Sequence, residues 1–318
     1  MEEGIGAAVI GYEELRHGGF LNKGLKVTHF SERKCYETYL REEELKRMAR
    51  GEGSSKQATG GPSQPRNWSI VGPSVRNMVR EVMHGNDMPR QLNKTLIVLI
   101  PKVDCPSSIK EFRPISLLNV VYKLVTKVLT TKMKRLMPLL IGPTQVSFIP
   151  GRHITDNIVI AQELIHTMRT VKGKRGYMVI KVDLEKAYDY VRWDYFEETL
   201  VIAGFPRLFV KSIMTCVTSA TMQLSWNGVL SAEFVPSRGV RQGDPISPYL
   251  FVLCMERLAL AISCYVNSGQ WRPISLGRGK VKIPYLMFAD DLLLFDEASH
   301  EQVGCVKEVL REFVMRLA

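Results

Sequence analysis

Hydrophobic and polar positions follow clear helix and strand periods only after residue 66. Before that point, residues 31–50 predict an exposed helix, because Ser31 can cap its start, Glu42–Lys46 and Glu43–Arg47 are i,i+4 pairs, and Gly51 can end it. Residues 51–65 are rich in Gly, Ser, Pro and Gln and predict a flexible linker. We therefore expect residues 1–66 to be an N-terminal segment unrelated to the rest of the chain.

The remainder predicts an irregular series of helices and strands. Apolar residues at helical spacing predict helices at 75–82, 119–136, 154–168, 193–202, 206–217, 245–266 and 302–318. Apolar β-forming runs predict strands at 94–100 and 177–183, and hairpins at 222–234 and 285–295. Because these elements do not repeat as βαβ units, we expect an α+β fold.

The helix at 119–136 has a distinct polarity. Its apolar side is expected to face the core through positions 120, 121, 124, 125, 128 and 129. Its opposite side carries Lys123, Lys127, Lys132 and Lys134, and we assign no function to that basic face.

The run 285–295 is apolar except for Asp290 and Asp291 at its centre. Adjacent ionised carboxylates are costly to bury unless something positive meets them. The two acids therefore either reach solvent at a hairpin tip or are neutralised by a cation. Asp183, at the end of the predicted strand 177–183, has a similar pair of interpretations: a helix N-cap, or a metal-binding or catalytic acid.

Charge and composition narrow the class of protein. The chain has 318 residues, is 45% hydrophobic and carries a net charge of +11, of which +10 belongs to residues 67–318. A basic excess suits a nucleic acid partner, although a basic soluble protein would show it as well. The six cysteines form no Cys-x-x-Cys pair, and no uninterrupted apolar run of about 18 residues or secretory signal is evident. We expect free thiols, no membrane span and an intracellular, reducing compartment, either nucleus or cytoplasm.

Three carboxylates in this order suggest a metal site. Asp183 is followed by the Gly-rich loop 238–244 and then by the Asp290-Asp291 pair. Carboxylates that converge need a cation, and hard oxygen ligands select Mg²⁺ or Mn²⁺. Two such ions about 4 Å apart are the device for in-line phosphoryl transfer.

These motifs resemble the palm of reverse transcriptases, and most closely that of LINE-type non-LTR retrotransposons of the plant kind. The palm-like segments are 183–188, 241–248 and 288–291, and the fingers-like segments are 100–102, 112–117 and 147–152. The resemblance covers residues 67–318.

The resemblance implies a right-hand polymerase fold. It places the fingers at about 92–176 and 195–240, and the palm at about 177–194 and 241–318. The palm would be a ferredoxin-like antiparallel sheet with helices on one face. The family's next palm element and its thumb would lie beyond residue 318, so we expect an incomplete palm and no thumb.

The resemblance also assigns site residues. Asp183 and Asp290 match the two acids that bridge the metal ions, and Asp291 matches the third acid beside them. The residues that match nucleotide-binding positions are Lys102, Arg113, Tyr188, Gln242 and Gly243.

These nucleotide-binding positions have separate roles in the family. Tyr188 would exclude a ribose 2′-hydroxyl, with plain core packing as the alternative. Gln242 and Gly243 would lie beside the incoming nucleotide. Arg113 and Lys102 would hold its triphosphate, with a solvated surface as the alternative for Lys102.

The implied function is RNA-directed DNA polymerase, with two Mg²⁺ or Mn²⁺ ions, an RNA template, a DNA primer and dNTPs. The alternative is a catalytically silent, nucleic-acid-binding remnant of a retroelement. A third possibility is a chain that does not fold stably, because the missing palm and thumb would leave apolar surface uncovered.

Overall fold

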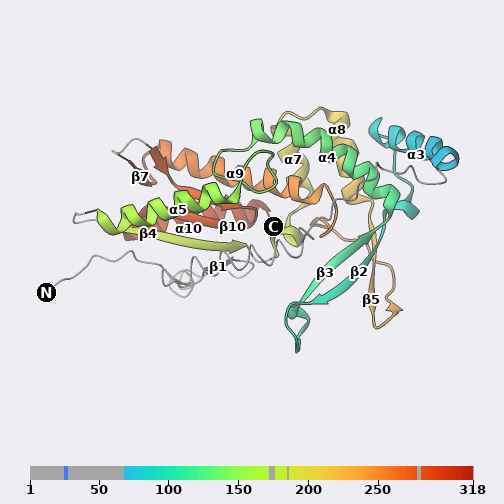
Figure 1. Cartoon of the computed structure of the whole chain (residues 1–318), viewed down its shortest axis with the longest axis horizontal. Coiled ribbons are helices and arrows are strands. Elements are labelled where there is room, and N and C mark those ends of the chain that lie inside the picture. Colours follow the sequence, from blue (N-terminus) through green and yellow to red (C-terminus); the bar gives the residue numbers. More distant parts are fainter. Residues whose placement is uncertain (1–24, 28–67, 172–175, 185, 278–280, 318) are drawn as a thin grey trace, which may run out of the picture.

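The computed structural model describes residues 25–27, 68–171, 176–184, 186–277 and 281–317 (Figure 1). The helix expected at 31–50, the linker expected at 51–65 and the proposed boundary at residue 66 lie outside these residues. Within the described part, the secondary structure forms two four-stranded sheets, a two-stranded ribbon and the helices around them.

The first sheet has the strand order β1-β4-β10-β9 and is antiparallel throughout. Its strands are β1 (Leu25–Val27), β4 (Tyr177–Leu184), β9 (Tyr285–Phe288) and β10 (Asp291–Glu297). The strand predicted at 177–183 and the hairpin predicted at 285–295 are confirmed. The edge strand β1 was not expected, because it comes from the N-terminal segment that the sequence pattern left without a role.

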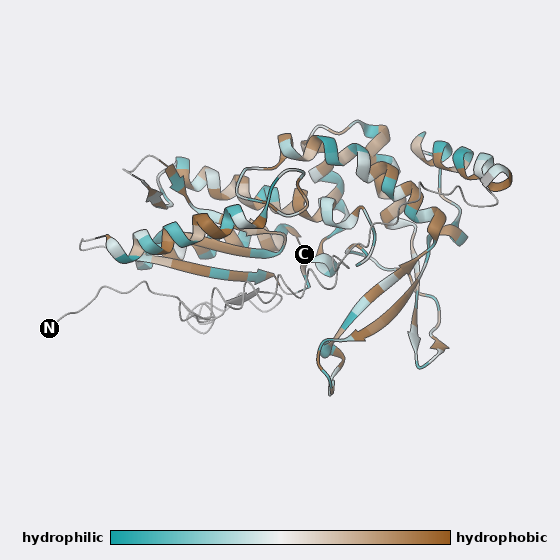
Figure 2. Cartoon of the chain, in the orientation of Figure 1, coloured by the Kyte–Doolittle hydropathy of each residue, from teal (hydrophilic) through white to brown (hydrophobic). Residues whose placement is uncertain are grey.

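Both faces of this sheet are covered. Helices α9 (Ser247–Asn267) and α10 (His300–Leu317) share one core cluster with the inward residues of β4 and β10. Helix α5 (Ile154–Thr170) packs on the other face, where Leu164 joins a second cluster with Leu286 and Phe295. In Figure 2 the strand β4 is accordingly mostly hydrophobic. The fold is α+β as predicted, but the expectation of helices on one face alone is wrong, because α5 and the ribbon of β7 (Ile274–Leu276) and β8 (Val281–Ile283) cover the second face.

The second sheet has the order β3-β2-β5-β6. Its strands are β2 (Lys94–Pro101), β3 (Phe112–Leu118), β5 (Thr221–Trp226) and β6 (Val229–Leu230), and β5 runs parallel to β2. The 3₁₀ turns η1 (Arg90–Asn93) and η2 (Ile109–Glu111) flank β2 and β3. The predicted Asn227-Gly228 turn is confirmed, since both residues have positive φ, 49° and 80°.

The remaining helices are α3 (Trp68–Met83), α4 (Val120–Leu140), α6 (Ala187–Tyr190), α7 (Trp193–Ile202) and α8 (Arg207–Thr218). They match the predictions, except that α3 begins seven residues earlier than the pattern indicated and α6 was not expected.

The predicted core face of α4 is partly wrong. Val120, Leu124 and Val128 are exposed, by 73%, 38% and 37%. The residues that α4 buries are Tyr122, Val125, Thr126, Leu129, Thr130, Met133 and Met137. The buried face therefore includes polar residues, which a hydrophobic period does not detect. Tyr122 lies there because its hydroxyl bonds to buried charged groups described below.

Helix α9 is the one described helix long and apolar enough to cross a membrane by length and composition alone. Buried core helices meet the same criterion, and α9 is packed against α4, α7 and α10. The sequence shows no uninterrupted apolar run here, because Glu256 and Arg257 lie within the helix.

Asp296 on β10 is an exception to this apolar packing. Its side chain is buried, and its Oδ2 has no hydrogen-bond partner. Burial raises its pKa to about 7. The folded state therefore holds a proton that the unfolded chain, with a carboxyl pKa of about 3.9, has already released. This contribution to stability is present below about pH 4 and is lost as the pH rises to about 7.

We predict that Asp296→Asn flattens the pH dependence of stability. Between pH 5 and pH 8 the wild-type protein should lose up to about 3 kcal/mol of unfolding free energy that the variant retains. Urea denaturation at several pH values measures this difference. Asp87→Asn, at an exposed position, is the control and should follow the wild type. Parallel curves for Asp296→Asn and the wild type would contradict the prediction.

Candidate active site

The three acids singled out in the sequence lie at one end of the first sheet. Asp183 on β4 and Asp291 on β10 are direct partners in the antiparallel register. Such partners point to the same face, with Cβ atoms about 5 Å apart. Asp290 is in the two-residue turn that joins β9 to β10. The hairpin tip thus brings Asp290 next to the cross-strand pair, and all three acids are half-buried.

A lysine lies beside these acids. Lys181 precedes Asp183 by two residues on β4 and therefore shares its face. Its Nζ is 3.7 Å from Oδ1 of Asp291, and each of the two side chains is only 12% exposed. The protein itself thus supplies one positive charge to the acidic group. The sequence analysis did not single out Lys181. Its position two residues before Asp183 on a predicted strand could have placed it on the same face as that acid.

The residue types suit a divalent ion. Carboxylate oxygens are the ligands that Mg²⁺ and Mn²⁺ prefer. In the part of the chain that the structure describes, no three His, Cys, Asp or Glu side chains form a ready-made metal centre. Mg²⁺ is commonly held by one or two carboxylates together with substrate phosphates. The set Asp183, Asp290 and Asp291 fits such a site, with Asp291 partly engaged by Lys181.

Tyr188 lies next to the acids, on the short helix α6 that follows β4. Its ring stacks on Phe251 of α9, with the centroids 4.2 Å apart and the planes 21° from parallel. Burial, and secondly the negative charge of Asp290, raise the pKa of Tyr188. The phenol is therefore protonated at neutral pH, and its hydroxyl is close enough to Asp290 for the charge to act on it.

The Gly-rich loop is bound to the second sheet. The carbonyl of Gln242 accepts a hydrogen bond from the Ser116 amide of β3, at 2.9 Å. Gly243 has φ +104°, and a Cβ there would lie 3.1 Å from the Ser116 carbonyl oxygen. The backbone itself therefore requires glycine at 243.

A cavity of about 200 Å³ opens beside this loop. It lies between the second sheet and the segment after β4, and its lining includes Ile97, Pro114, Ser116, Asp189, Arg238 and Gln242. Gln242 therefore lies next to an open volume, and its nucleotide-binding role stays a prediction.

Lys102 and Arg113 are on the hairpin β2–β3, which projects from the body of the molecule (Figure 1). Both are exposed. Lys102 donates from Nζ to the Lys110 carbonyl, at 3.0 Å, across the hairpin tip. The structure does not bring these two residues to the acids, and their roles stay predictions.

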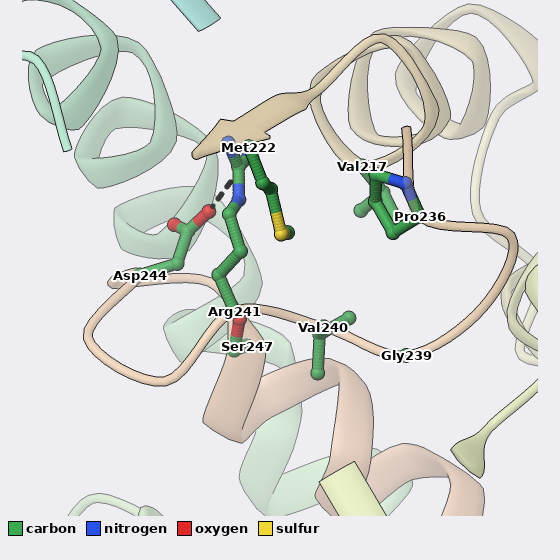
Figure 3. A pocket seen from close by; sticks show the side chains of 8 residues that line it. All are labelled: Val217, Met222, Pro236, Gly239, Val240, Arg241, Asp244 and Ser247. Carbon is green, nitrogen blue, oxygen red and sulfur yellow. Dashed lines mark hydrogen bonds and ion pairs between the residues drawn. The ribbon is translucent and has the colours of Figure 1, made fainter. Parts of the chain in front are cut away.

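Arg241, next to Gln242, belongs to a buried network that the sequence did not reveal. Its guanidinium lies 3.2 Å from Oδ2 of Asp244 (Figure 3), and both side chains are almost fully buried. Tyr122 of α4 donates to the same carboxylate at 2.5 Å, and its ring lies under the guanidinium. Asp244 also accepts from the Ile246 amide.

The same guanidinium reaches three further segments. It donates to Asn93 Oδ1 at 2.6 Å, Thr95 Oγ1 at 3.0 Å and the Cys216 carbonyl at 2.9 Å. These partners belong to η1, β2 and α8. We call Arg241, Asp244 and Tyr122 with these partners the Arg241 network. It fixes the Gly-rich loop to the second sheet and to the helices behind it.

Comparison with known proteins gives a family match. The model described as "Reverse transcriptase (RNA-dependent DNA polymerase)" matches residues 100–317. The "Transposon TX1 uncharacterized 149 kDa protein" of Xenopus laevis is 29% identical over 71% of this chain and 17% of its own length. The "Retrovirus-related Pol polyprotein from type-2 retrotransposable element R2DM" of Drosophila melanogaster is 30% identical over 66% of this chain and 19% of its own.

The chain thus spans about a fifth of the length of these relatives. Among solved structures, a telomerase from Candida tropicalis in complex with a fragment of telomeric RNA aligns with a TM-score of 0.49 and 15% identity. That alignment covers 79% of this chain and 43% of the telomerase chain.

We predict a large loss of stability when the guanidinium of Arg241 is removed from the Arg241 network. Arg241→Met leaves the Asp244 carboxylate buried without its charge partner and should cost about 3–5 kcal/mol of unfolding free energy. Arg241→Met combined with Asp244→Leu should recover part of that loss. Guanidinium denaturation measures both.

The matched control for this prediction is Arg192→Met. Arg192 pairs with Asp194 on the surface, where both side chains are at least half exposed, so its loss should cost less than about 1 kcal/mol. Equal losses for Arg241→Met and Arg192→Met would show that the Arg241 network does not stabilise the fold.

Proposed function

Because the chain belongs to the reverse transcriptase family, we propose that the end of its first sheet is the catalytic centre of an RNA-directed DNA polymerase. The reaction would add dNTPs to the 3′-hydroxyl of a DNA primer on an RNA template. The observation that carries the proposal is the register pair Asp183–Asp291 with Asp290 in the adjoining turn. Two strands and their turn present three carboxylates at one point, as a phosphoryl-transfer site requires.

Asp183, Asp290 and Asp291 would hold two Mg²⁺ or Mn²⁺ ions, since the family generally uses divalent metals. When bound, such ions lower the pKa of the attacking 3′-hydroxyl and neutralise charge on the triphosphate. The carboxylates of the chain fix where that charge is compensated, and Lys181 limits the repulsion among them. Catalysis then depends mainly on positioning and on electrostatic stabilisation.

The family resemblance assigns the nucleotide-binding residues, and the geometry supports the roles of Tyr188 and Gln242. Tyr188, held by Phe251 and close to Asp290, would stand where the sugar of the incoming dNTP lies. Gln242 and the cavity beside it would receive the base of the nucleotide or of the template. Arg113 and Lys102 would approach the triphosphate from the projecting hairpin.

A second function has its own support. Helix α4 carries five basic residues and no acidic residue. In the described structure, none of the five forms an ion pair with a described carboxylate. A chain that binds nucleic acid without polymerising would retain this surface, so the enzyme assay must be joined to a binding assay.

Primer extension on a homopolymer RNA template with Mg²⁺ tests the enzymatic proposal. Asp183→Asn and Asp290→Asn should each lower incorporation by about 100-fold or more, since each removes a charge that the transition state requires. Asp87→Asn, at an exposed position on another part of the surface, should be as active as the wild type. Full activity in either active-site variant would refute the metal assignment. Absence of incorporation by the wild type, with salt-sensitive RNA binding intact, would favour the silent binder.

Tyr188 can be tested by sugar selectivity. Tyr188→Ala removes the bulk beside Asp290 and should lower the preference for dNTPs over rNTPs by about 10-fold or more, on the scale of a close-packed contact. Tyr188→Phe keeps the ring on Phe251 and should keep the preference. The ratio of incorporation efficiencies for dNTP and rNTP gives the readout. An unchanged ratio in Tyr188→Ala would leave Tyr188 with packing alone.

A further inference from the structure

The turn that carries Asp290 has an unusual backbone. Ala289 has φ +54°, a left-handed conformation that residues with a Cβ rarely adopt. In a two-residue hairpin such a position is normally occupied by Gly, Asn or Asp. Ala289 is also buried, so water does not satisfy its peptide groups. Something in the surrounding structure must hold this conformation.

The side chain of Gln145 bonds to both peptide groups of Ala289. Its Oε1 accepts from the Ala289 amide at 3.1 Å, and its Nε2 lies 3.5 Å from the Ala289 carbonyl oxygen, to which it donates. Oε1 also accepts from the Ser147 amide at 3.0 Å. Gln145 is 1% exposed. The side-chain amide of Gln145 thus bonds to both the N–H and the C=O of Ala289 in the turn.

The backbone around Gln145 is fixed to strand β9. Gln145 forms a parallel bridge with Met287, the residue two positions before Ala289. The Met287 amide donates to the Thr144 carbonyl, and the Val146 amide donates to the Met287 carbonyl, at 3.0 and 3.3 Å. Asn157 of α5 donates from Nδ2 to the carbonyls of both Thr144 and Met287. Segment 144–146 therefore acts as a short extra strand whose side chain reaches the turn.

We propose that Gln145 is a positioning residue that holds the Ala289-Asp290 turn in its left-handed form and so sets where Asp290 and Asp291 present their carboxylates. The inference rests on the proposed function of those acids. Gln145 bonds to the peptide groups of Ala289 and so acts on the adjoining acids through the backbone of the turn. A side-chain amide suits this role, because its oxygen accepts and its NH2 donates, matching both peptide groups of Ala289.

The test uses Gln145→Met, which keeps the volume and removes the hydrogen bonds, and Gln145→Ala. The first readout is hydrogen exchange of the peptide that spans residues 285–291. The Ala289 amide should exchange at least about 10-fold faster in both variants. The second readout is Mn²⁺ binding to the full chain without nucleic acid, which should weaken by about 10-fold or more. In primer extension, kcat should fall while KM for the primer-template stays the same.

Gln302→Ala is a matched control. Gln302 is equally buried, and its amide also bonds in both directions, accepting from the Arg272 amide and donating to the Gln270 carbonyl, both at 2.8 Å. It lies at the other end of β10, so its loss should leave the exchange of 285–291 and Mn²⁺ binding unchanged. This separates positioning of the turn from a general loss of buried hydrogen bonds.

Ala289→Gly supplies a rescue. Glycine adopts positive φ without strain, so Ala289→Gly in the Gln145→Met background should restore at least about a third of the lost Mn²⁺ affinity and kcat. Unchanged exchange in Gln145→Met, or no rescue by Ala289→Gly, would overturn the inference. Full activity in Asp183→Asn would instead refute the proposed function. Faster exchange of the Ala289 amide in Gln145→Met would still support the role of Gln145 in holding the turn.

Discussion

The buried ion pair between Arg241 and Asp244 connects the parts of this molecule that must stay in register. One guanidinium reaches η1, β2, α4 and α8, which come from three distant stretches of the chain. A buried charge of this kind is costly unless every hydrogen bond is made. The arrangement therefore tolerates few alternatives, and it fixes the loop with Gln242 and Gly243 at one position relative to the second sheet.

The acidic end of the first sheet follows a different rule. Its carboxylates lie half-buried next to apolar strands, and Lys181 supplies one positive charge beside them. The Arg241 network pairs one buried carboxylate with one buried guanidinium, whereas the acidic group brings three carboxylates to one end of the sheet. The Arg241 network therefore serves to stabilise the fold, whereas the three acids have the composition of a metal-binding site.

The sequence predicted those features that depend on local pattern. Strand β4, the hairpin β9–β10 and the meeting of Asp183 with Asp291 follow from residue periods and the order of the acids. Lys181, Gln145 and Arg241 were missed, because their roles depend on partners distant in the chain. The buried face of α4 was misplaced for a related reason: Tyr122 is in the core, where its hydrogen bond to Asp244 rather than hydrophobicity accounts for its burial.

The loops of the candidate site are positioned by hydrogen bonds that join the predicted fingers to the predicted palm. The Gln242 carbonyl is bonded to Ser116 of the second sheet, and the turn with Asp290 is bonded to Gln145, which precedes the first sheet's central strand in sequence. Both bonds cross the boundary predicted between the two parts. Since each fixes a loop through its backbone, neither could be read from the side chains of the catalytic motifs. The precision of the site therefore depends on contacts between the parts, and a change far from the acids can alter where the carboxylates lie.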